Sequence, residues 1–335
     1  MKKVGIIGCG NIARVHGWVL QNMENVALAA ACDVEEEKAT ALAKQYGTEK
    51  TKIYTDWHEM CETELDVVHI CTPHYLHAPM AVEFLKQETA VFMEKPCAIS
   101  REQFAELKRE AVMHPGKLGF CFQNRYNETT QAMDRMVAEG KIGKVKGGRA
   151  FVTWRRDADY YACSPWKGVW ATEGGGALVN QSIHTLDLLL RYLGAPEQVE
   201  ATCSNHHLQG VIEVEDTAEA WLAFHDGKRG CFYASNGYAA DAPVLLELEG
   251  EQGRITMNGS EVTLWTKEKG AEHFSYETKN GIGKGYWGCG HQACIRDFYR
   301  CLEEGRRFQG DVEGVENTFD TMMRIYEKGE HLWNG

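Results

Sequence analysis

The sequence has no long apolar run. No stretch approaches the roughly 20 consecutive apolar residues that a membrane-spanning helix needs. Residues 1–17 are basic and then apolar, but Gly5, Gly8 and Gly10 interrupt the apolar part, so the segment lacks the continuous core of a signal peptide. No internal repeat or low-complexity linker is present either. We therefore expect a cytoplasmic protein that does not bind a membrane.

Closely spaced cysteines and a basic surface are also missing. The 12 cysteines are scattered without a CxxC pair, which is typical of buried thiols in a reducing compartment. The net charge of −12, with no basic cluster, argues against nucleic acid as a partner. With 335 residues, of which 44% are hydrophobic, the chain is long enough for two domains that each have a core.

The first motif is GCGNIA at residues 8–13, which follows a short apolar run and opens onto a helix-compatible segment. In such a turn Gly8 permits the tight bend, Gly10 lets the backbone approach a pyrophosphate, and Ala13 permits close helix packing. The helix N-terminus then offers N–H groups to the phosphates. The cofactor contacts expected here are Gly8, Gly10, Asn11 and Ile12.

A second apolar run, residues 26–32, ends at Asp33. An acid about 20 residues beyond the glycine turn is expected to meet the adenosine ribose hydroxyls. Because Asp33 would repel a 2′-phosphate, the sequence favours NAD over NADP. Arg14 and Lys38 are the nearest residues that could weaken this inference.

Apolar runs and helix-length segments continue to alternate up to residue 122, which predicts a parallel sheet with helices on both faces. Ligands of such sheets bind at the carboxyl ends of the strands. CTPHYLH at 71–77, EKP at 94–96 and QNRYN at 123–127 each follow such an end, so all three should border one crevice. The further cofactor contacts expected are Thr72, Pro73, His74, His77, Glu94, Lys95 and Asn124.

Two groups of residues could suggest a metal. His74 and His77 are spaced to share one, but no third ligand stands near them, and a histidine in a loop beside a nucleotide needs no metal. Cys289, His291 and Cys294 form a chance pattern. We expect no metal site.

Beyond residue 126 short segments alternate in polarity and are separated by turns, which predicts a largely antiparallel sheet with one covered face. Residues 294–306 and 312–330 are expected to close the chain as helices. The predicted fold is therefore α/β, with a doubly wound Rossmann domain over residues 1–122 and an α+β domain over residues 123–335.

Residues 173–194, EGGGALVNQSIHTLDLLLRYLG, run from three glycines into an amphipathic helix that should end at Gly194. On a 3.6-residue period, Asn180, His184 and Asp187 form one polar stripe beside an apolar one. Consecutive glycines mark a special turn or a close approach to a ligand. From these residues alone, a surface stripe beside a tight turn and a functional site both remain open.

These motifs in this order resemble the Gfo/Idh/MocA oxidoreductases, the glucose-fructose oxidoreductase and inositol dehydrogenase family, over essentially the whole chain. The resemblance implies hydride transfer between NAD(P) and a secondary hydroxyl or ketone of a sugar, sugar derivative or polyol. It also implies a second domain that binds substrate and forms oligomers, so a homodimer or homotetramer is expected.

In that family the EKP lysine lies beside the nicotinamide and the substrate hydroxyl, and a helix histidine is the general acid/base. These roles fall on Lys95 and His184. Histidine titrates near neutral pH without help, whereas a lysine needs its pKa lowered by burial or a nearby positive charge. We assign His184 as principal acid/base and Lys95 as the group that positions and polarises the substrate oxygen. The reverse assignment and a structural role for His184 remain alternatives.

The sequence departs from the family at Asn180, where relatives often carry an acid. An asparagine can orient a hydroxyl or an imidazole but cannot share a proton at neutral pH. The departure argues against inositol dehydrogenase proper and favours nucleotide-linked sugars, sugar acids or glycosides. Two further readings are glycoside cleavage through transient oxidation by tightly held NAD, and a non-catalytic nucleotide-sensing regulator, against which Lys95 and His184 argue.

Residues 155–173 are rich in aromatic and basic side chains, which can stack on sugar rings and hold anionic groups. A loop that uses its aromatics as a core is the alternative. The expected substrate contacts are Lys95, Tyr161, Trp166, Lys167, Asn180 and His184. The glycine-rich residues 281–294 could also reach the pocket.

Overall fold

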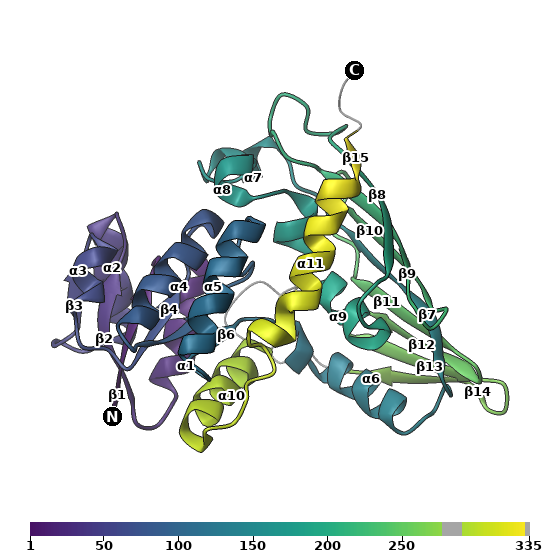
Figure 1. The fold of residues 1–335 in the computed structure, drawn as a ribbon, viewed down its shortest axis with the longest axis horizontal. Helices are drawn as coiled ribbons and strands as arrows, with labels where there is room; N and C mark the ends of the chain where they lie inside the picture. Colours follow the sequence, from purple (N-terminus) through teal and green to yellow (C-terminus); the bar gives the residue numbers. More distant parts are fainter. Residues whose placement is uncertain (277–289, 332–335) are drawn as a thin grey trace. The chain divides into compact units, whose positions relative to one another are not determined.

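The computed structural model describes residues 1–276 and 290–331, which form two compact units (Figure 1). The first unit comprises the described parts of Met1–Gln123 and Asn280–Val315, and the second those of Asn124–Lys279 and Glu316–Gly335. The expected division into two continuous segments is therefore wrong in one respect. After the second unit's sheet, the chain returns to the first unit before it ends.

The first unit contains a six-stranded parallel sheet in the order β3-β2-β1-β4-β5-β6. Strands β4 and β5 are buried along their whole length, as expected for strands covered on both faces. The strands are β1 Lys2–Ile7, β2 Val26–Cys32, β3 Lys52–Tyr54, β4 Val67–Ile70, β5 Ala90–Met93 and β6 Leu118–Phe120. The helices are α1 Asn11–Gln21, α2 Glu36–Tyr46, α3 Trp57–Cys61, η1 His74–Leu76, α4 His77–Lys86 and α5 Arg101–Met113. The predicted doubly wound domain is confirmed.

Helix α10, Gly290–Glu304, packs into the first unit against α1. The ring centroids of Phe298 and Phe92 are 5.1 Å apart, and the hydroxyl of Tyr299 lies 3.0 Å from Nε2 of His69. These aromatic side chains are fully buried in the core of the sheet. The sequence predicted this helix but could not show which domain would bury its apolar face.

The second unit contains a nine-stranded sheet in the order β14-β13-β12-β11-β7-β10-β9-β8-β15. The β7–β10 and β8–β15 pairs are parallel and the other pairs antiparallel, which confirms the expected largely antiparallel sheet. Helices α6 and α9 cover one face. The strands are β7 Val145–Thr153, β8 Gln198–Ser204, β9 Thr217–Ala223, β10 Arg229–Ser235, β11 Leu245–Gly250, β12 Gly253–Asn258, β13 Glu261–Thr266, β14 Gly270–Ser275 and β15 Glu330–His331.

The helices of this half of the chain include the predicted closing helix α11. They are η2 Gln123–Tyr126, α6 Glu128–Ala138, α7 Ala158–Ala162, α8 Trp170–Glu173, η3 Ala177–Ser182, α9 Ile183–Leu193 and α11 Val312–Lys328. Helix α9 ends at Gly194, as predicted. Across residues 1–276 and 290–331, no helix combines the length and apolar composition that crossing a bilayer requires.

The three glycines before α9 are required by contacts with the protein itself. Gly174 adopts φ 78° and ends α8. A Cβ on Gly175 would lie 2.0 Å from the hydroxyl oxygen of Tyr326, and one on Gly176 would lie 2.0 Å from the carbonyl oxygen of Glu215. Gly175 and Gly176 are therefore required because the chain passes close to α11 and to the segment before β9. This reason differs from the ligand contact that the sequence suggested.

The segment after the glycines, η3, is a π-helix rather than the first turns of a regular α-helix. The buried carboxylate of Glu215 accepts hydrogen bonds from the backbone N–H groups of Gly176 and Leu178, both at 2.9 Å, and from the hydroxyl of Tyr326 at 3.0 Å. Ser182 Oγ donates back to the carbonyl of Ala177 at 2.8 Å. These bonds hold the wider turn, a form that occurs frequently at functional sites.

We predict that Gly175→Ala destabilises the protein more than Gly210→Ala does. Both residues have positive φ, 144° and 75°, so both substitutions add backbone strain of about 1–2 kcal/mol. Only at Gly175 would the new Cβ also collide with Tyr326, whereas nothing lies within 4 Å of one at Gly210. This collision should add about 1–3 kcal/mol to the loss of unfolding free energy in urea. Equal losses for the two variants would contradict it.

The buried carboxyl of Glu215 should make stability depend on pH. Burial raises its pKa from 4.5 to about 7, although the backbone N–H groups oppose this shift. The folded state thus favours the protonated form, and this stabilisation, complete below pH 4.5, is lost as pH rises through 7. The group should change the unfolding free energy by about 3 kcal/mol over that window.

Urea titrations across this pH range test the effect. Glu215→Gln, which cannot ionise, should flatten the fall in unfolding free energy, whereas Glu219→Gln, on the exposed face of β9, should leave the slope as in the wild type. Identical slopes in the wild type and Glu215→Gln would show that this carboxyl does not titrate in the folded state.

Candidate functional site

The strands at the centre of the first sheet end in register. Ile7 lies opposite both Cys32 and Ile70, and Ile70 lies opposite Met93. The residues that follow these strand ends therefore lie side by side along one edge, in the order Asp33, Gly8, Cys71 and Glu94. The predicted meeting of the glycine turn with the CTP and EKP motifs is confirmed by this topology.

The glycine turn has the features that a pyrophosphate requires. Gly8 adopts φ 81°, and a Cβ there would lie 2.6 Å from the carbonyl oxygen of Cys71, so no other residue fits without a shift. Gly10 precedes α1, and no atom lies within 4 Å of its Cβ position. No side chain caps this helix, which leaves its first N–H groups, beside Asn11 and Ile12, able to bind an anion.

The carboxylate of Asp33 is held against this turn. Its Oδ2 accepts a hydrogen bond from the backbone N–H of Cys9 at 2.7 Å, and its Oδ1 accepts one from Glu35 N at 2.9 Å. Each oxygen retains a lone pair that could accept a ribose hydroxyl. The ammonium group of Lys38 is bonded to Glu35 at 2.6 Å, so it already has an anionic partner.

His77 has a different position from the one expected of a cofactor contact. It is buried, with Nδ1 2.8 Å from the carbonyl oxygen of Pro96 and Nε2 2.9 Å from that of Thr72. Its ring therefore lies between the CTP loop and the EKP loop. His74 is buried as well, whereas Thr72 and Pro73 are half-buried at the strand edge.

Glu94 is also buried, and its Oε1 lies 3.1 Å from Nε2 of His16 on α1. Burial would raise the pKa of Glu94, but the hydrogen bond with His16 and the nearby ammonium group of Lys95 hold it well below its usual range. Lys95 follows directly and is half-buried. His16 was not among the predicted site residues, although a lone histidine on the apolar face of α1 was a visible signal.

The expected polar stripe of the second unit divides into two parts. Asp187 is buried and accepts hydrogen bonds from Arg125 Nε at 2.7 Å and Thr318 Oγ1 at 2.8 Å, so it anchors α9. In residues 175–190, by contrast, Asn180 and His184 are the two side chains that are not buried. The accessible part of the stripe is therefore Asn180 and His184.

An acid that the sequence analysis missed lies beside Asn180. Glu173 is fully buried, and its Oε1 accepts a hydrogen bond from Asn180 Nδ2 at 2.5 Å. Its Oε2 accepts one from the backbone N–H of Gly168, also at 2.5 Å. The carboxylate thus links the aromatic loop to η3, and its place immediately before three glycines was the signal available in the sequence.

Of the three loop residues expected to contact substrate, Tyr161 is placed in the core. It packs with Leu208, Ile212 and Val214, and its hydroxyl accepts a hydrogen bond from Asn236 Nδ2 at 3.0 Å. The alternative in which this aromatic forms the core of the loop therefore describes it better than a substrate contact.

The other expected contacts lie nearer the surface. Trp166 and Lys167 are half-buried, and Lys167 Nζ lies 4.0 Å from the ring centroid of Tyr160. Asn124 is half-buried, and its side-chain oxygen accepts a hydrogen bond from Asn127 at 3.4 Å. Of residues 281–294, positions 281–289 lie outside the described residues.

Sequence comparison with known families covers both halves of the chain. A family described as "Oxidoreductase family, NAD-binding Rossmann fold" matches residues 2–120. The family's "GFO/IDH/MocA C-terminal domain" matches residues 130–256.

Several characterised proteins are similar to this chain. The D-glucoside 3-dehydrogenase of Escherichia coli K12 is 29% identical over 67% of this chain and 67% of its own length. The myo-inositol 2-dehydrogenase of Thermotoga maritima is 26% identical over 76% and 74%.

Among solved structures, an oxidoreductase from Agrobacterium radiobacter, crystallised with NAD+, L-tartaric acid and magnesium, has a TM-score of 0.86 at 19% identity. The match covers 98% of this chain and 96% of that one, and at this identity it shows the shared fold. Since the two family matches follow each other along most of the sequence, the chain belongs to the Gfo/Idh/MocA family and is an oxidoreductase with an NAD-binding Rossmann fold.

Proposed function

We propose that this enzyme transfers a hydride between NAD and a secondary hydroxyl or ketone of a sugar, sugar derivative or polyol. The observation that carries the proposal is the pair Asn180 and His184, the two side chains left accessible in an otherwise buried helical segment. Oxidation of a CH–OH group needs one side chain that orients the hydroxyl and another that takes its proton. An amide can do the first and an imidazole the second.

NAD would supply the hydride acceptor, and the edge of the first sheet would hold it. Gly8 and Gly10 with the N-terminus of α1 fit the pyrophosphate, and Asp33 fits the adenosine ribose. An anionic Asp33 disfavours a 2′-phosphate, so NAD is preferred to NADP. Thr72 and Pro73, at the neighbouring strand end, border the same site.

The protein's own groups would handle the proton and the substrate oxygen. His184 takes the hydroxyl proton as the hydride leaves the carbon, and Lys95 polarises the same oxygen. Asn180, whose amide nitrogen is bonded to Glu173, can present its carbonyl oxygen to a second sugar hydroxyl. Trp166 and Lys167 would contact the rest of the substrate.

A glycoside, sugar acid or nucleotide-linked sugar is the substrate class that we favour. Asn180 is not the acid expected of inositol dehydrogenase proper, and one of the similar proteins is a D-glucoside 3-dehydrogenase. The same groups could also serve cleavage of a glycoside by transient oxidation. That reaction would consume substrate without net release of NADH, which distinguishes the two.

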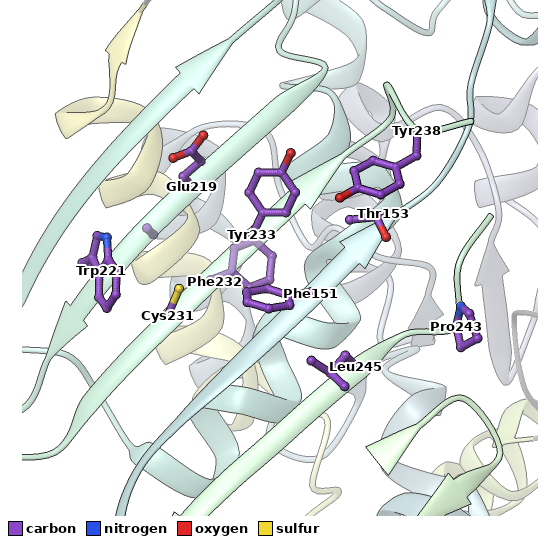
Figure 2. A pocket seen from close by; sticks show the side chains of 11 residues that line it. Phe151, Thr153, Glu219, Trp221, Cys231, Phe232, Tyr233, Tyr238, Pro243 and Leu245 are labelled. Carbon is purple, nitrogen blue, oxygen red and sulfur yellow. The ribbon is translucent and has the colours of Figure 1, made fainter. Parts of the chain in front are cut away.

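We also propose that the chain forms a homodimer or homotetramer through the uncovered face of the second sheet. Figure 2 shows a shallow pocket on this face, lined by side chains from β7, β9, β10 and β11. Trp221 is 64% exposed there and Tyr238 47% exposed, an unusual display of aromatic surface. The free thiols among the described residues support a cytoplasmic location, and the net charge of −12 argues against nucleic acid as a partner.

The two catalytic assignments can be tested together. Lys95→Ala and His184→Ala should each lower turnover by about 10²- to 10⁴-fold while the Kd for NAD stays within a few-fold of wild type. Lys86→Ala, which removes a surface lysine paired with Glu83, is the control and should keep wild-type turnover. NADH absorbance with a panel of glycosides, sugar acids and polyols provides the measurement. Full turnover in both active-site variants would refute the assignment.

The oligomer proposal has a separate test. Trp221→Glu should shift the enzyme toward the monomer in sedimentation velocity, because a charge would have to be desolvated in the interface. Val112→Glu, which changes an apolar side chain 73% exposed on α5, should leave the mass unchanged. An unchanged mass for Trp221→Glu would exclude this face as the main contact.

A further inference from the structure

Four buried side chains of the first unit form a continuous line of hydrogen-bonded groups. The hydroxyl of Tyr299 on α10 lies 3.0 Å from Nε2 of His69 on β4, and Nδ1 of His69 lies 2.8 Å from Nδ1 of His16 on α1. Nε2 of His16 then lies 3.1 Å from Oε1 of Glu94. The two histidines have no exposed surface, and Tyr299 and Glu94 have 2% and 7%.

The direction of these hydrogen bonds follows from the chemistry of the ends. An ionised carboxylate can only accept, so Nε2 of His16 donates to Glu94. A neutral imidazole donates from one nitrogen only, so Nδ1 of His16 accepts from Nδ1 of His69. Nε2 of His69 is then left to accept from the hydroxyl of Tyr299. Every donor and acceptor along the line has a partner in this arrangement.

Protonation of His16 would reverse the direction of the hydrogen bonds between His16, His69 and Tyr299. Both nitrogens of His16 would then donate, so His69 would have to accept at Nδ1 and donate from Nε2 to Tyr299. The buried hydroxyl of Tyr299 would lose the acceptor it has in the neutral arrangement, which is unfavourable. Burial also lowers the pKa of His69 well below its usual range and raises that of Tyr299, so both stay uncharged.

We propose that His16, His69 and Tyr299 are positioning residues of the active site, which act through Glu94 to hold an ionised carboxylate beside Lys95. The proposal rests on the role given above to Lys95 as the group that polarises the substrate oxygen. A carboxylate that shares no proton keeps its full attraction for the ammonium group. The line of hydrogen bonds thus sets the charge of the residue that precedes Lys95.

Other titratable groups face these four side chains. Burial lowers the pKa of His291 to about 4, and burial raises the pKa of the thiols of Cys71 and Cys121 well above its usual value, so these groups are uncharged at neutral pH. Asp66, which is exposed at the start of β4, acts on Tyr299. Within residues 1–276 and 290–331, the titratable groups that act on the line or on its neighbours include Asp66, Cys71, Lys95, Cys121, His291 and Cys294.

A metal site is the competing use of the same residues. Ligand atoms of His16, Glu94 and Cys121 lie within 4.8 Å of one another. Coordination through His16, however, would need a lone pair on a nitrogen that the line already occupies. Uptake of metal would therefore break the arrangement, which makes it a distinguishable outcome.

Nitrogen-15 NMR of the full-length protein, labelled at histidine, reads the arrangement directly. We expect the Nε2–H tautomer at His16 and the Nδ1–H tautomer at His69 from about pH 6 to pH 8. Tyr299→Phe removes only the terminal donor and should give mixed tautomers at His69. Tyr46→Phe, which removes a hydroxyl in α2 outside the line, should leave both signals unchanged.

The pH dependence of kcat should change together with the tautomers of His16 and His69. In Tyr299→Phe the acid limb of the pH profile of kcat should move upward by about one pH unit, because one hydrogen bond that favours the uncharged arrangement of the line is lost. The KM for NAD should be unchanged. His69→Asn, whose amide can still donate to His16, should retain more activity than His69→Leu. A merely structural role would lower stability in both variants without moving the pH profile.

The outcomes separate this proposal from the proposed function. An imidazolium or an Nδ1–H tautomer at His16 at neutral pH would overturn it, and so would stoichiometric Zn²⁺ uptake that abolishes the His16 N–H signal. Full activity of Lys95→Ala would instead remove the proposed role of Lys95, even with the expected tautomers in place.

Discussion

In each of the two units, the candidate site residues depend on one physical constraint: a carboxylate taken out of water must have its lone pairs satisfied by donors. Glu94 receives His16, Glu173 receives Gly168 and Asn180, and Glu215 receives two backbone N–H groups and a tyrosine. Each carboxylate therefore fixes one segment that carries or adjoins a candidate site residue. Removing either partner would leave the other buried and unsatisfied, so these segments cannot relax independently of their anchors.

Each accessible residue of the candidate site has a buried residue next to it that holds its segment in place. Lys95 follows Glu94 directly, and Asn180 is bonded to Glu173. His184 has its helix tied down through Asp187. An accessible side chain on a rigid support loses less conformational entropy when a substrate orders it. Burial of so many polar groups is thus consistent with precise placement of the few that remain accessible.

Features that depend on local sequence could be predicted. Alternation of apolar runs and helical periods predicted the parallel first sheet and the largely antiparallel second sheet, because side-chain periodicity reports burial directly. The short strand β3 was not among the predicted runs. The turn at Gly8 and the end of α9 at Gly194 follow from backbone conformation, which is local, and Asp33 follows from its spacing after the glycine turn.

Features that depend on a distant partner could not be predicted. His77 stands in a loop beside a nucleotide motif, yet carbonyl groups on both sides of its ring bury it. Tyr161 lies in a loop rich in aromatics, and its core partners are about 50 residues further along the chain. The π-helix η3 exists because Glu215 takes N–H groups from it. No period in the local sequence carries that information.

The hydrogen bond between Asn180 and Glu173 bears on the acid that relatives often carry at position 180. The structure provides a carboxylate at this place, but it comes from the residue before the glycines and reaches the helix only through the amide of Asn180. An amide held by a carboxylate donates in one fixed sense and does not titrate. Proton transfer would then fall to His184, and Asn180 would select a substrate by accepting a hydroxyl hydrogen bond. With the proposed roles, the departure would separate hydroxyl recognition from acid–base chemistry, two tasks that a carboxylate at position 180 could combine.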